Sequence, residues 1–291
     1  MCMGFGCNAA GVIGCRIIDS PREKLISIIT NAFVPCNGRF PFLITIAMIF
    51  FAGGLSSGLA SVVSTLAVMV VVLIGIMLTF AISNILSKTI LKGVSSSFIL
   101  ELPPYRKPQI GKILFRSIFD RTLFVLARAI SVAAPAGIVI WIMANLQISD
   151  ISLLNYVANF LDPFAKLMGL DGYILTAFIL GFPANEIVLP IILMCYMQTG
   201  VLVDMENTQS IGKILIENGW TWLTAINTMI FTLLHFPCST TTLSIKKESG
   251  SWKWAGIAFA LPTIIGIALC MITTFVAHIF IWYSYKKKPS H

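Results

Sequence analysis

The chain has 291 residues, of which 57% are hydrophobic and 11% charged, with a mean hydropathy of +0.90. Soluble domains carry about 25% charged residues, so this composition excludes a soluble protein. It predicts an all-α, polytopic bundle of transmembrane helices. The net charge of +8 does not indicate nucleic-acid binding, because membrane proteins collect Lys and Arg in cytoplasmic loops and no alternation of aromatic and basic residues is present.

Six apolar segments approach the length of about 20 residues that a spanning helix needs. They are expected at residues 40–52 (with 25–34 as an apolar lead-in), 60–82, 123–146, 172–197, 222–242 and 254–283. The fourth segment is broken by GFPANEIVLP, from Gly181 to Pro190, and the fifth is broken at His235-Phe236-Pro237-Cys238. The fold is therefore expected to contain broken or re-entrant helices.

The loop between the second and third segments carries seven Lys and Arg against Glu101 and Asp120, which predicts that it faces the cytoplasm. Its ELPPYRKP stretch, residues 101–108, cannot be helical through its prolines. Residues 111–128 are amphipathic and are expected at the membrane interface. The charges of the later loops predict an external position for 198–219 and an internal position for 245–253. Six segments that each cross the membrane once cannot satisfy all of these positions. A hairpin at the broken fourth segment would resolve part of this conflict.

The breaks belong to an internal repeat. Gly4-Phe5-Gly6-Cys7-Asn8 and Gly181-Phe182-Pro183-Ala184-Asn185 share the pattern G-F-x-x-N. Each is followed by a Pro-Cys pair, at Cys36 and at Cys238. Irregular backbone at membrane depth is tolerated only where it is buried in protein or lines a cavity. Interrupted segments at matching positions of two halves indicate a transporter's binding site.

Glu186 is an acidic residue inside an apolar segment, and such a residue is a functional candidate by default. The alternative is a structural pair with Arg39 or Arg128. Burying its carboxylate unpaired would cost several kcal/mol or raise its pKa.

The other candidate ligands lie at the breaks. Thiolates bind soft or borderline metals such as ferrous iron, and Asn side chains add carbonyl oxygens, while a histidine can act as a ligand or a proton carrier. The alternatives are a cysteine acting as a small hydrophobe and a histidine that only packs. The sequence has no C-x-x-C pair, so a closed structural zinc site is not expected. It also has no phosphate-binding loop of the G-x-x-x-x-G-K-[ST] type, and enzyme activity is not expected. The candidate metal residues are Cys7, Cys36, Cys238, Glu186, Asn8, Asn185 and His235.

These stretches resemble the membrane domain of the bacterial ferrous iron transporter B family. The matching pieces, in the family's order, are GFGCN with Arg16, SPREKLISII, PCNGRFP, FILELPPYRKP, GFPANEIVLP and HFPCSTTTLSIKKESGSWKWA. In this family two gate segments, also found in nucleoside transporters, flank a central region. The resemblance implies a partial first gate at 1–56, the central region at 57–130 and the second gate with the C-terminal helices at 131–291. Asn185-Glu186 stands where many members have Lys-Glu.

The resemblance further implies a multi-pass permease that moves Fe²⁺ across the bacterial cytoplasmic membrane, with Cys7, Cys36 and Cys238 on or near the metal path. Fe²⁺ would be the transported substrate, and no permanently bound cofactor is expected. Full-length members begin with a GTPase domain that this sequence does not show. Its expected partners are therefore the lipid bilayer, a separate GTPase and N-terminal membrane subunit, and further copies of the chain. The alternatives are a transporter of a nucleoside or other small polar solute, and a non-transporting membrane fragment.

Overall fold

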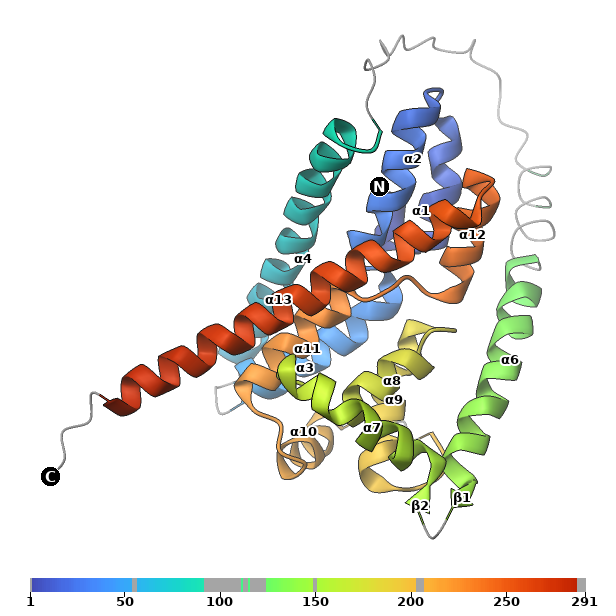
Figure 1. Ribbon diagram of the computed structural model, residues 1–291. Coiled ribbons are helices and arrows are strands. Elements are labelled where there is room, and N and C mark those ends of the chain that lie inside the picture. The colour runs from blue at the N-terminus through green and yellow to red at the C-terminus, as the bar shows by residue number, and fades with distance from the viewer. Residues whose placement is uncertain are drawn as a thin grey trace, which may run out of the picture.

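The computed structural model describes residues 2–53, 57–91, 111, 115, 124–148, 151–202 and 207–286. These residues are almost entirely helical (Figure 1), which confirms the expected all-α membrane fold. Two short strands, β1 (Gln147–Ile148) and β2 (Ile151–Ser152), form one antiparallel pair. The α-helices are α1 (Asn8–Gly14), α2 (Pro21–Thr30), α3 (Phe40–Phe51), α4 (Ser57–Lys88), α6 (Phe124–Asn145), α7 (Leu153–Leu167), α8 (Gly172–Leu180), α9 (Val188–Met197), α10 (Thr208–Glu217), α11 (Trp222–Leu234), α12 (Ser239–Ser249) and α13 (Trp252–Lys286). The 3₁₀ turns are η1 (Cys2–Phe5), η2 (Cys15–Ile17), η3 (Asn31–Phe33), η4 (Asn37–Arg39) and η6 (Asn185–Ile187).

Three described stretches are long and apolar enough to cross a membrane: Pro21–Phe51, Gly58–Lys88 and Trp252–Phe280. The last two confirm the second and sixth predicted segments, and α6 lies in the third. The first span begins earlier than expected, because α2 is part of it rather than an apolar lead-in. The ELPPYRKP stretch and nearly all of the amphipathic stretch 111–128 lie outside the described residues.

The broken fourth segment forms a helical hairpin. Asp171 accepts the backbone N–H of Ile174 at 2.7 Å and so caps the start of α8. The hydroxyl of Tyr196, near the end of α9, donates to the other carboxylate oxygen of Asp171. The start of α8 therefore lies beside the end of α9, and the G-F-x-x-N sequence forms the tip between them. A second sharp bend, of 110°, separates α7 from α8.

The observed first span, Pro21–Phe51, and the fifth segment are each broken in the middle and run in opposite directions. In Figure 1 the chain descends from α2 to α3, whereas it ascends from α11 to α12. Each break follows a helix end and contains the Pro-Cys pair. The two broken spans therefore run antiparallel to each other, which is the arrangement expected for the halves of an inverted repeat.

The long helices α4 and α13 lie against these breaks. A Cβ added at Gly75 of α4 would lie 3.0 Å from the carbonyl oxygen of Phe33 and 3.0 Å from Leu233. One added at Gly266 of α13 would lie 3.0 Å from Cβ of Leu234. These glycines let the long helices approach the broken backbone closely.

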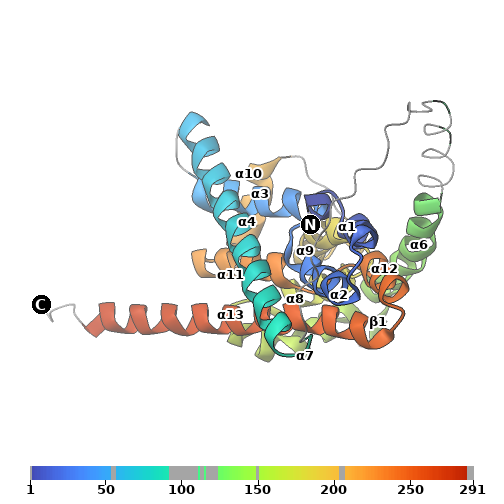
Figure 2. The same ribbon diagram turned by 90° about the horizontal axis from the view of Figure 1, so that it is seen from above.

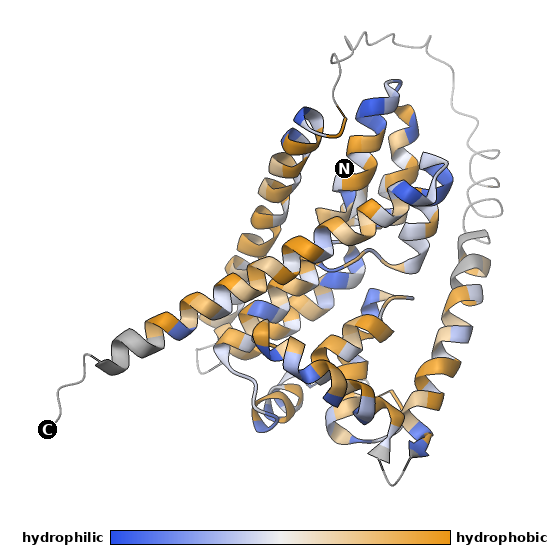
Figure 3. Cartoon of the chain, in the orientation of Figure 1, coloured by the Kyte–Doolittle hydropathy of each residue, from blue (hydrophilic) through white to orange (hydrophobic). Residues whose placement is uncertain are grey.

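The outer faces of the long helices are apolar. Met77 of α4 is 70% exposed and Phe280 of α13 is 75% exposed. Figure 3 shows hydrophobic residues along most of α4, α6 and α13, and Figure 2 shows α13 extending beyond the rest of the bundle. Such surfaces suit contact with lipid.

The crossing of α7 and α8 depends on Gly172. A Cβ at this position would lie 1.9 Å from the carbonyl oxygen of Ala158. We predict that Gly172→Ala lowers the free energy of unfolding by about 1–3 kcal/mol, because backbone must move to make room. Thermal unfolding in detergent measures this change.

The matched control is Gly256→Ala in α13, where a Cβ meets nothing within 4 Å. Alanine there should be neutral or stabilising by about 0.5–1 kcal/mol, as in other helix interiors. Equal unfolding temperatures for the two variants would contradict the close α7–α8 crossing.

Candidate functional site

The two G-F-x-x-N sequences, each called a tip below, have the same backbone conformation before the asparagine. Cys7, which precedes Asn8, has φ −152° and ψ 124°, and Ala184, which precedes Asn185, has φ −151° and ψ 122°. Each tip is tied to the Pro-Cys break of its own half. The N–H of Asn37 donates to the carbonyl of Gly6 at 3.3 Å in the first half.

The second half has a similar contact one position earlier in the repeat, because the N–H of Ser239 donates to the carbonyl of Phe182 at 2.9 Å. The hydroxyl of Ser239 also donates to the carbonyl of Pro183 at 3.3 Å. Asn37 and Ser239 each directly follow the cysteine of their break. The sequence repeat is therefore also a repeat of backbone geometry.

Arg39 joins the two halves. Its side chain is 1% exposed, and Nη1 donates to the carbonyl of Leu233 at 2.8 Å. Nη2 donates to the carbonyls of His235 and Phe236 at 3.0 and 3.2 Å. These carbonyls lie at the end of α11, where the break removes the N–H groups that a continuous helix would supply. The guanidinium replaces those donors and places its charge at the negative end of the α11 dipole.

Three predicted ligands form a chain of contacts beside Arg39. The amide of Asn185 lies between Cys36 and His235, with Nδ2 at 3.8 Å from Sγ of Cys36 and Oδ1 at 3.2 Å from Nε2 of His235. Cys36 is 9% exposed, Asn185 8% and His235 1%. The first Pro-Cys break and the second tip therefore meet directly.

The histidine ring in this chain is held by two carbonyls. Nδ1 lies 2.9 Å from the carbonyl of Thr232 and 3.2 Å from that of Phe231. Carbonyl oxygens only accept, so they fix the ring proton on Nδ1 and leave Nε2 as an acceptor. With that tautomer, the NH₂ group of Asn185 has to face Nε2, and its oxygen is then free to accept the S–H of Cys36.

The remaining two candidate cysteines differ in exposure. Cys238 is partly buried, and its sulfur lies 3.2 Å from the hydroxyl of Thr241. Cys7 is exposed. The thiols of Cys7 and Cys36 lie within electrostatic reach of Cys238, and both Cys36 and Cys238 lie within electrostatic reach of Arg39.

Glu186 lies at the edge of this group. Its side chain is exposed and covers Gly38, where an added Cβ would lie 3.1 Å from Oε1. It forms no ion pair with a described basic side chain. The alternative pairing with Arg39 is wrong, because the guanidinium donates to carbonyls instead. The side chain of Arg128 lies outside the described residues.

Asn8 is the candidate that lies apart from the thiols. Its side chain is 3% exposed and lies against the backbone of Gly4 and Val34. The sequence analysis also missed Asn31, whose Nδ2 donates to the backbone carbonyl of Asn8 at 2.9 Å. Within the described residues, no group of three or more His, Cys, Asp or Glu side chains could by itself hold a metal ion. Any metal in this region would need amide or carbonyl oxygens to complete its shell.

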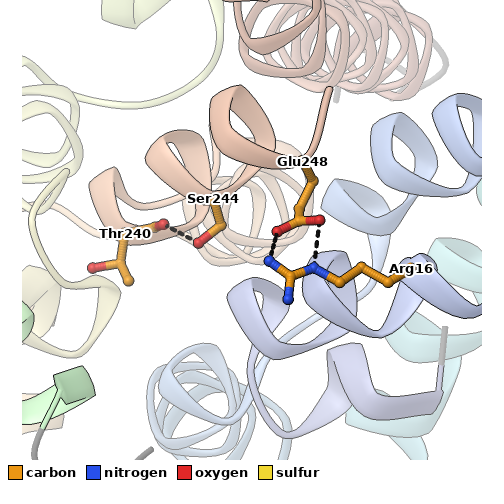
Figure 4. A network of polar contacts seen from close by, with 4 residues as sticks. All are labelled: Arg16, Thr240, Ser244 and Glu248. Atoms are coloured by element: carbon orange, nitrogen blue, oxygen red, sulfur yellow. Dashed lines mark hydrogen bonds and ion pairs between the residues drawn. The ribbon is translucent and has the colours of Figure 1, made fainter. Parts of the chain in front are cut away.

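A second link between the halves lies at the surface. Figure 4 shows Arg16 of η2 facing Glu248 of α12, with Nε and Nη2 donating to the two carboxylate oxygens at 2.7 and 2.5 Å. The Glu248 side chain is only 5% exposed. One turn earlier, the Ser244 hydroxyl donates to the carbonyl of Thr240 at 2.8 Å. The hydrogen bonds from Arg16 lower the pKa of Glu248 below its ordinary value, and burial opposes that shift.

Two family models match the chain. The model described as "Ferrous iron transport protein B C terminus" matches residues 68–120, and the model described as "Nucleoside recognition" matches residues 126–252. The second match includes the hairpin of α8 and α9 and the α11–α12 break.

Curated relatives match almost the whole chain. The protein named Fe(2+) transporter FeoB from Staphylococcus aureus strain COL is 31% identical over 290 residues, which are 97% of this chain and 40% of the relative. The Fe(2+) transporter FeoB of Methanocaldococcus jannaschii is 27% identical over 293 residues, with coverages of 96% and 41%. A protein of Porphyromonas gingivalis named as a fusion of Fe(2+) transport protein A and Fe(2+) transporter FeoB is 26% identical, with coverages of 95% and 36%. The chain thus spans about two-fifths of the length of these relatives, and no solved structure matches it.

Removing the guanidinium of Arg39 should destabilise the protein strongly. In Arg39→Met three buried carbonyls lose their donors, and we predict a loss of about 3 kcal/mol or more. Arg39→Lys should lie between methionine and wild type, because one ammonium group cannot reproduce the planar fork. Unfolding in detergent measures both variants.

Arg22→Met serves as the control for this prediction. Arg22 also donates to backbone carbonyls, those of Ser87 and Leu91, but it is only partly buried. Its loss should cost about 1 kcal/mol. Equal costs for the two methionine variants would mean that the carbonyls of the α11 end do not depend on Arg39.

The pair of Arg16 and Glu248 should make stability depend on pH. Because the pKa of folded Glu248 is lowered, its contribution is present above about pH 4.3, the ordinary pKa of glutamate. It is lost as the pH falls through the lower pKa of the folded protein. The difference in unfolding temperature between wild type and Glu248→Gln should therefore be constant near neutral pH and shrink in acid.

Glu217→Gln is the control, because Glu217 faces Lys213 at 3.9 Å and its side chain is 62% exposed. Exposed pairs of this kind contribute little, so this variant should follow the wild-type profile. A difference between wild type and Glu248→Gln that persists unchanged to pH 3 would contradict the prediction.

Proposed function

This chain belongs to the ferrous iron transporter B family, and we propose that it forms the part of such a transporter through which Fe²⁺ crosses the cytoplasmic membrane. In this proposal residues 1–56 contribute to the first gate, 57–130 form the central region, and 131–291 form the second gate. The partners are the lipid bilayer, a GTPase with further membrane helices, and other copies of the chain.

The convergence of Cys36, Cys238 and Asn185 at the two breaks supports this proposal. Thiolates prefer soft and borderline metals over alkali and alkaline-earth cations. An amide oxygen and freed backbone carbonyls can complete the coordination shell without adding charge. The two thiols come from opposite halves of an inverted repeat, which is where transporters of this architecture hold their substrate.

The exposed Glu186 and Cys7 suit the outer part of such a path. A carboxylate attracts a divalent cation from water at little cost, because it stays solvated. The ion would then exchange water for the sulfur atoms of Cys36 and Cys238. His235 is screened from the thiols by Asn185, so we assign it to positioning that amide rather than to direct ligation.

Arg39 has a specific role in this proposal. Its positive charge repels a bound cation. This repulsion would keep the thiols from holding the metal tightly. Weak binding is a requirement for passage, because the ion must also leave.

We predict that Cys36→Ser and Cys238→Ser each reduce iron-55 uptake by about tenfold or more, as expected when a ligand of the path is lost. Uptake is measured in anaerobic cells that express the chain together with its neighbouring genes. Glu186→Gln should raise the Fe²⁺ concentration needed for half-maximal uptake and leave the maximal rate closer to wild type, because the charge acts on capture.

Cys2→Ser is the matched control, since Cys2 is an exposed thiol that lies outside the breaks. Unchanged uptake in both Cys36→Ser and Cys238→Ser, with normal amounts of folded protein, would overturn the proposal. The match to the "Nucleoside recognition" model favours a second candidate, transport of a nucleoside. In that case nucleosides would compete for uptake and Fe²⁺ would not.

A further inference from the structure

Asn31 presents a buried polar atom without a partner. The residue is 1% exposed, and its Oδ1 accepts no hydrogen bond from any described residue. Its Nδ2 is already used by the carbonyl of Asn8, so the amide cannot turn over without losing that bond. A buried acceptor without a donor destabilises the folded protein, which indicates that this oxygen has a further partner in the working protein.

Other oxygens gather at the same place. One terminal atom of the Asn8 amide lies 3.1 Å from the carbonyl oxygen of Gly4 and 3.2 Å from that of Val34. A Cβ added at Gly4 would lie 2.6 Å from Oδ1 of Asn31 and 3.4 Å from Oδ1 of Asn8. Both amides therefore converge on the backbone of Gly4, next to the tip of the first half.

Turning over the Asn8 amide explains part of this arrangement. Its NH₂ group then donates to the carbonyls of Gly4 and Val34, and these three groups are satisfied. Oδ1 of Asn31 still has no donor in that orientation. A hydrogen-bond rearrangement alone therefore does not satisfy the cluster.

We propose that this cluster binds a monovalent cation, Na⁺ or K⁺, through Oδ1 of Asn8, Oδ1 of Asn31 and the carbonyl oxygens of Gly4 and Val34. Ca²⁺, which is close to Na⁺ in size, takes oxygen ligands at about 2.3–2.6 Å, so neighbouring ligands of an ion of this size lie roughly 3.0–3.7 Å apart. The separations of 3.1 and 3.2 Å at Asn8 fall in this range. On binding, the Asn8 amide turns its oxygen toward the ion, and Oδ1 of Asn31 gains its partner.

The charge of the site selects a monovalent ion. All four ligands are neutral, and no carboxylate or thiolate is among them, so they cannot replace the hydration shell of a divalent metal. Val34 directly follows the end of α2 and η3, where the helix dipole is negative. Helix ends and unwound carbonyls of this kind hold Na⁺ in broken-helix transporters.

The site differs from the thiol site in its chemistry and does not depend on the proposed transport of Fe²⁺. Gly6 and Cys7, directly before Asn8, are exposed, so the cluster lies close to solvent along the chain. Gly11 also borders it, because a Cβ there would lie 2.6 Å from Oδ1 of Asn31. An ion at this position would hold the first tip against the first break.

Thermal unfolding of the purified chain in detergent tests the proposal without iron. At constant ionic strength, Na⁺ or K⁺ in place of N-methylglucamine should raise the unfolding temperature in a saturable way, by about 3 °C or more near 100 mM. Asn31→Leu should abolish this rise. Asn31→Asp should lower the half-saturating cation concentration by about tenfold, because a carboxylate replaces an amide oxygen.

Asn145→Leu is the control, since this exposed amide lies in α6 and should leave the cation effect unchanged. The proposal is overturned if the wild type unfolds at the same temperature in all three salts, or if Mg²⁺ at equal ionic strength replaces the effect. If Asn31→Leu does not fold, Asn31→Asp decides. Equal destabilisation of that variant in every salt would show that Oδ1 of Asn31 serves a bound water or packing only.

Discussion

The buried guanidinium of Arg39 holds the two halves of this protein together. Pro237 ends α11 in apolar surroundings, where carbonyl groups without donors are costly. Arg39 supplies donors to three of these carbonyls from the start of α3. This contact fixes the start of one broken helix against the end of the other. It thereby brings Cys36 next to Asn185 and His235, so that the position of every candidate ligand near the thiols depends on it.

The two halves meet the same backbone problem with different chemistry. At the α11 end the missing donors come from a charged side chain of the opposite half. At the α2 end the carbonyl of Val34 faces an amide of its own half, that of Asn8. A fixed positive charge repels cations, whereas an amide can present either NH₂ or oxygen. An inverted repeat can therefore keep one geometry and still give its two ends opposite preferences for charge.

The sequence predicts the long helices, the positions of the breaks and the repeat, because hydrophobic runs and Gly or Pro interruptions are local signals. It does not predict the partners of Arg39, since backbone carbonyls leave no residue pattern to read. It misplaces Glu186, because the 3₁₀ turn at Asn185–Ile187 turns that carboxylate outward while Asn185 stays buried. The hydropathy of α2 is lowered by polar residues such as Ser27 and Thr30, so the sequence does not predict that this helix belongs to the first span and packs inside the bundle. These outcomes depend on contacts between distant segments.

Gly75 places α4, a helix that carries none of the candidate ligands, against the segments that precede both breaks. The same small patch of its surface contacts the carbonyl of Phe33 in one half and Leu233 in the other. A side chain at this position would have to displace the backbone at Phe33 and shift the side chain of Leu233. The segments that precede the two breaks therefore pack against one point of α4, and the close approach of α4 to both of them depends on this glycine.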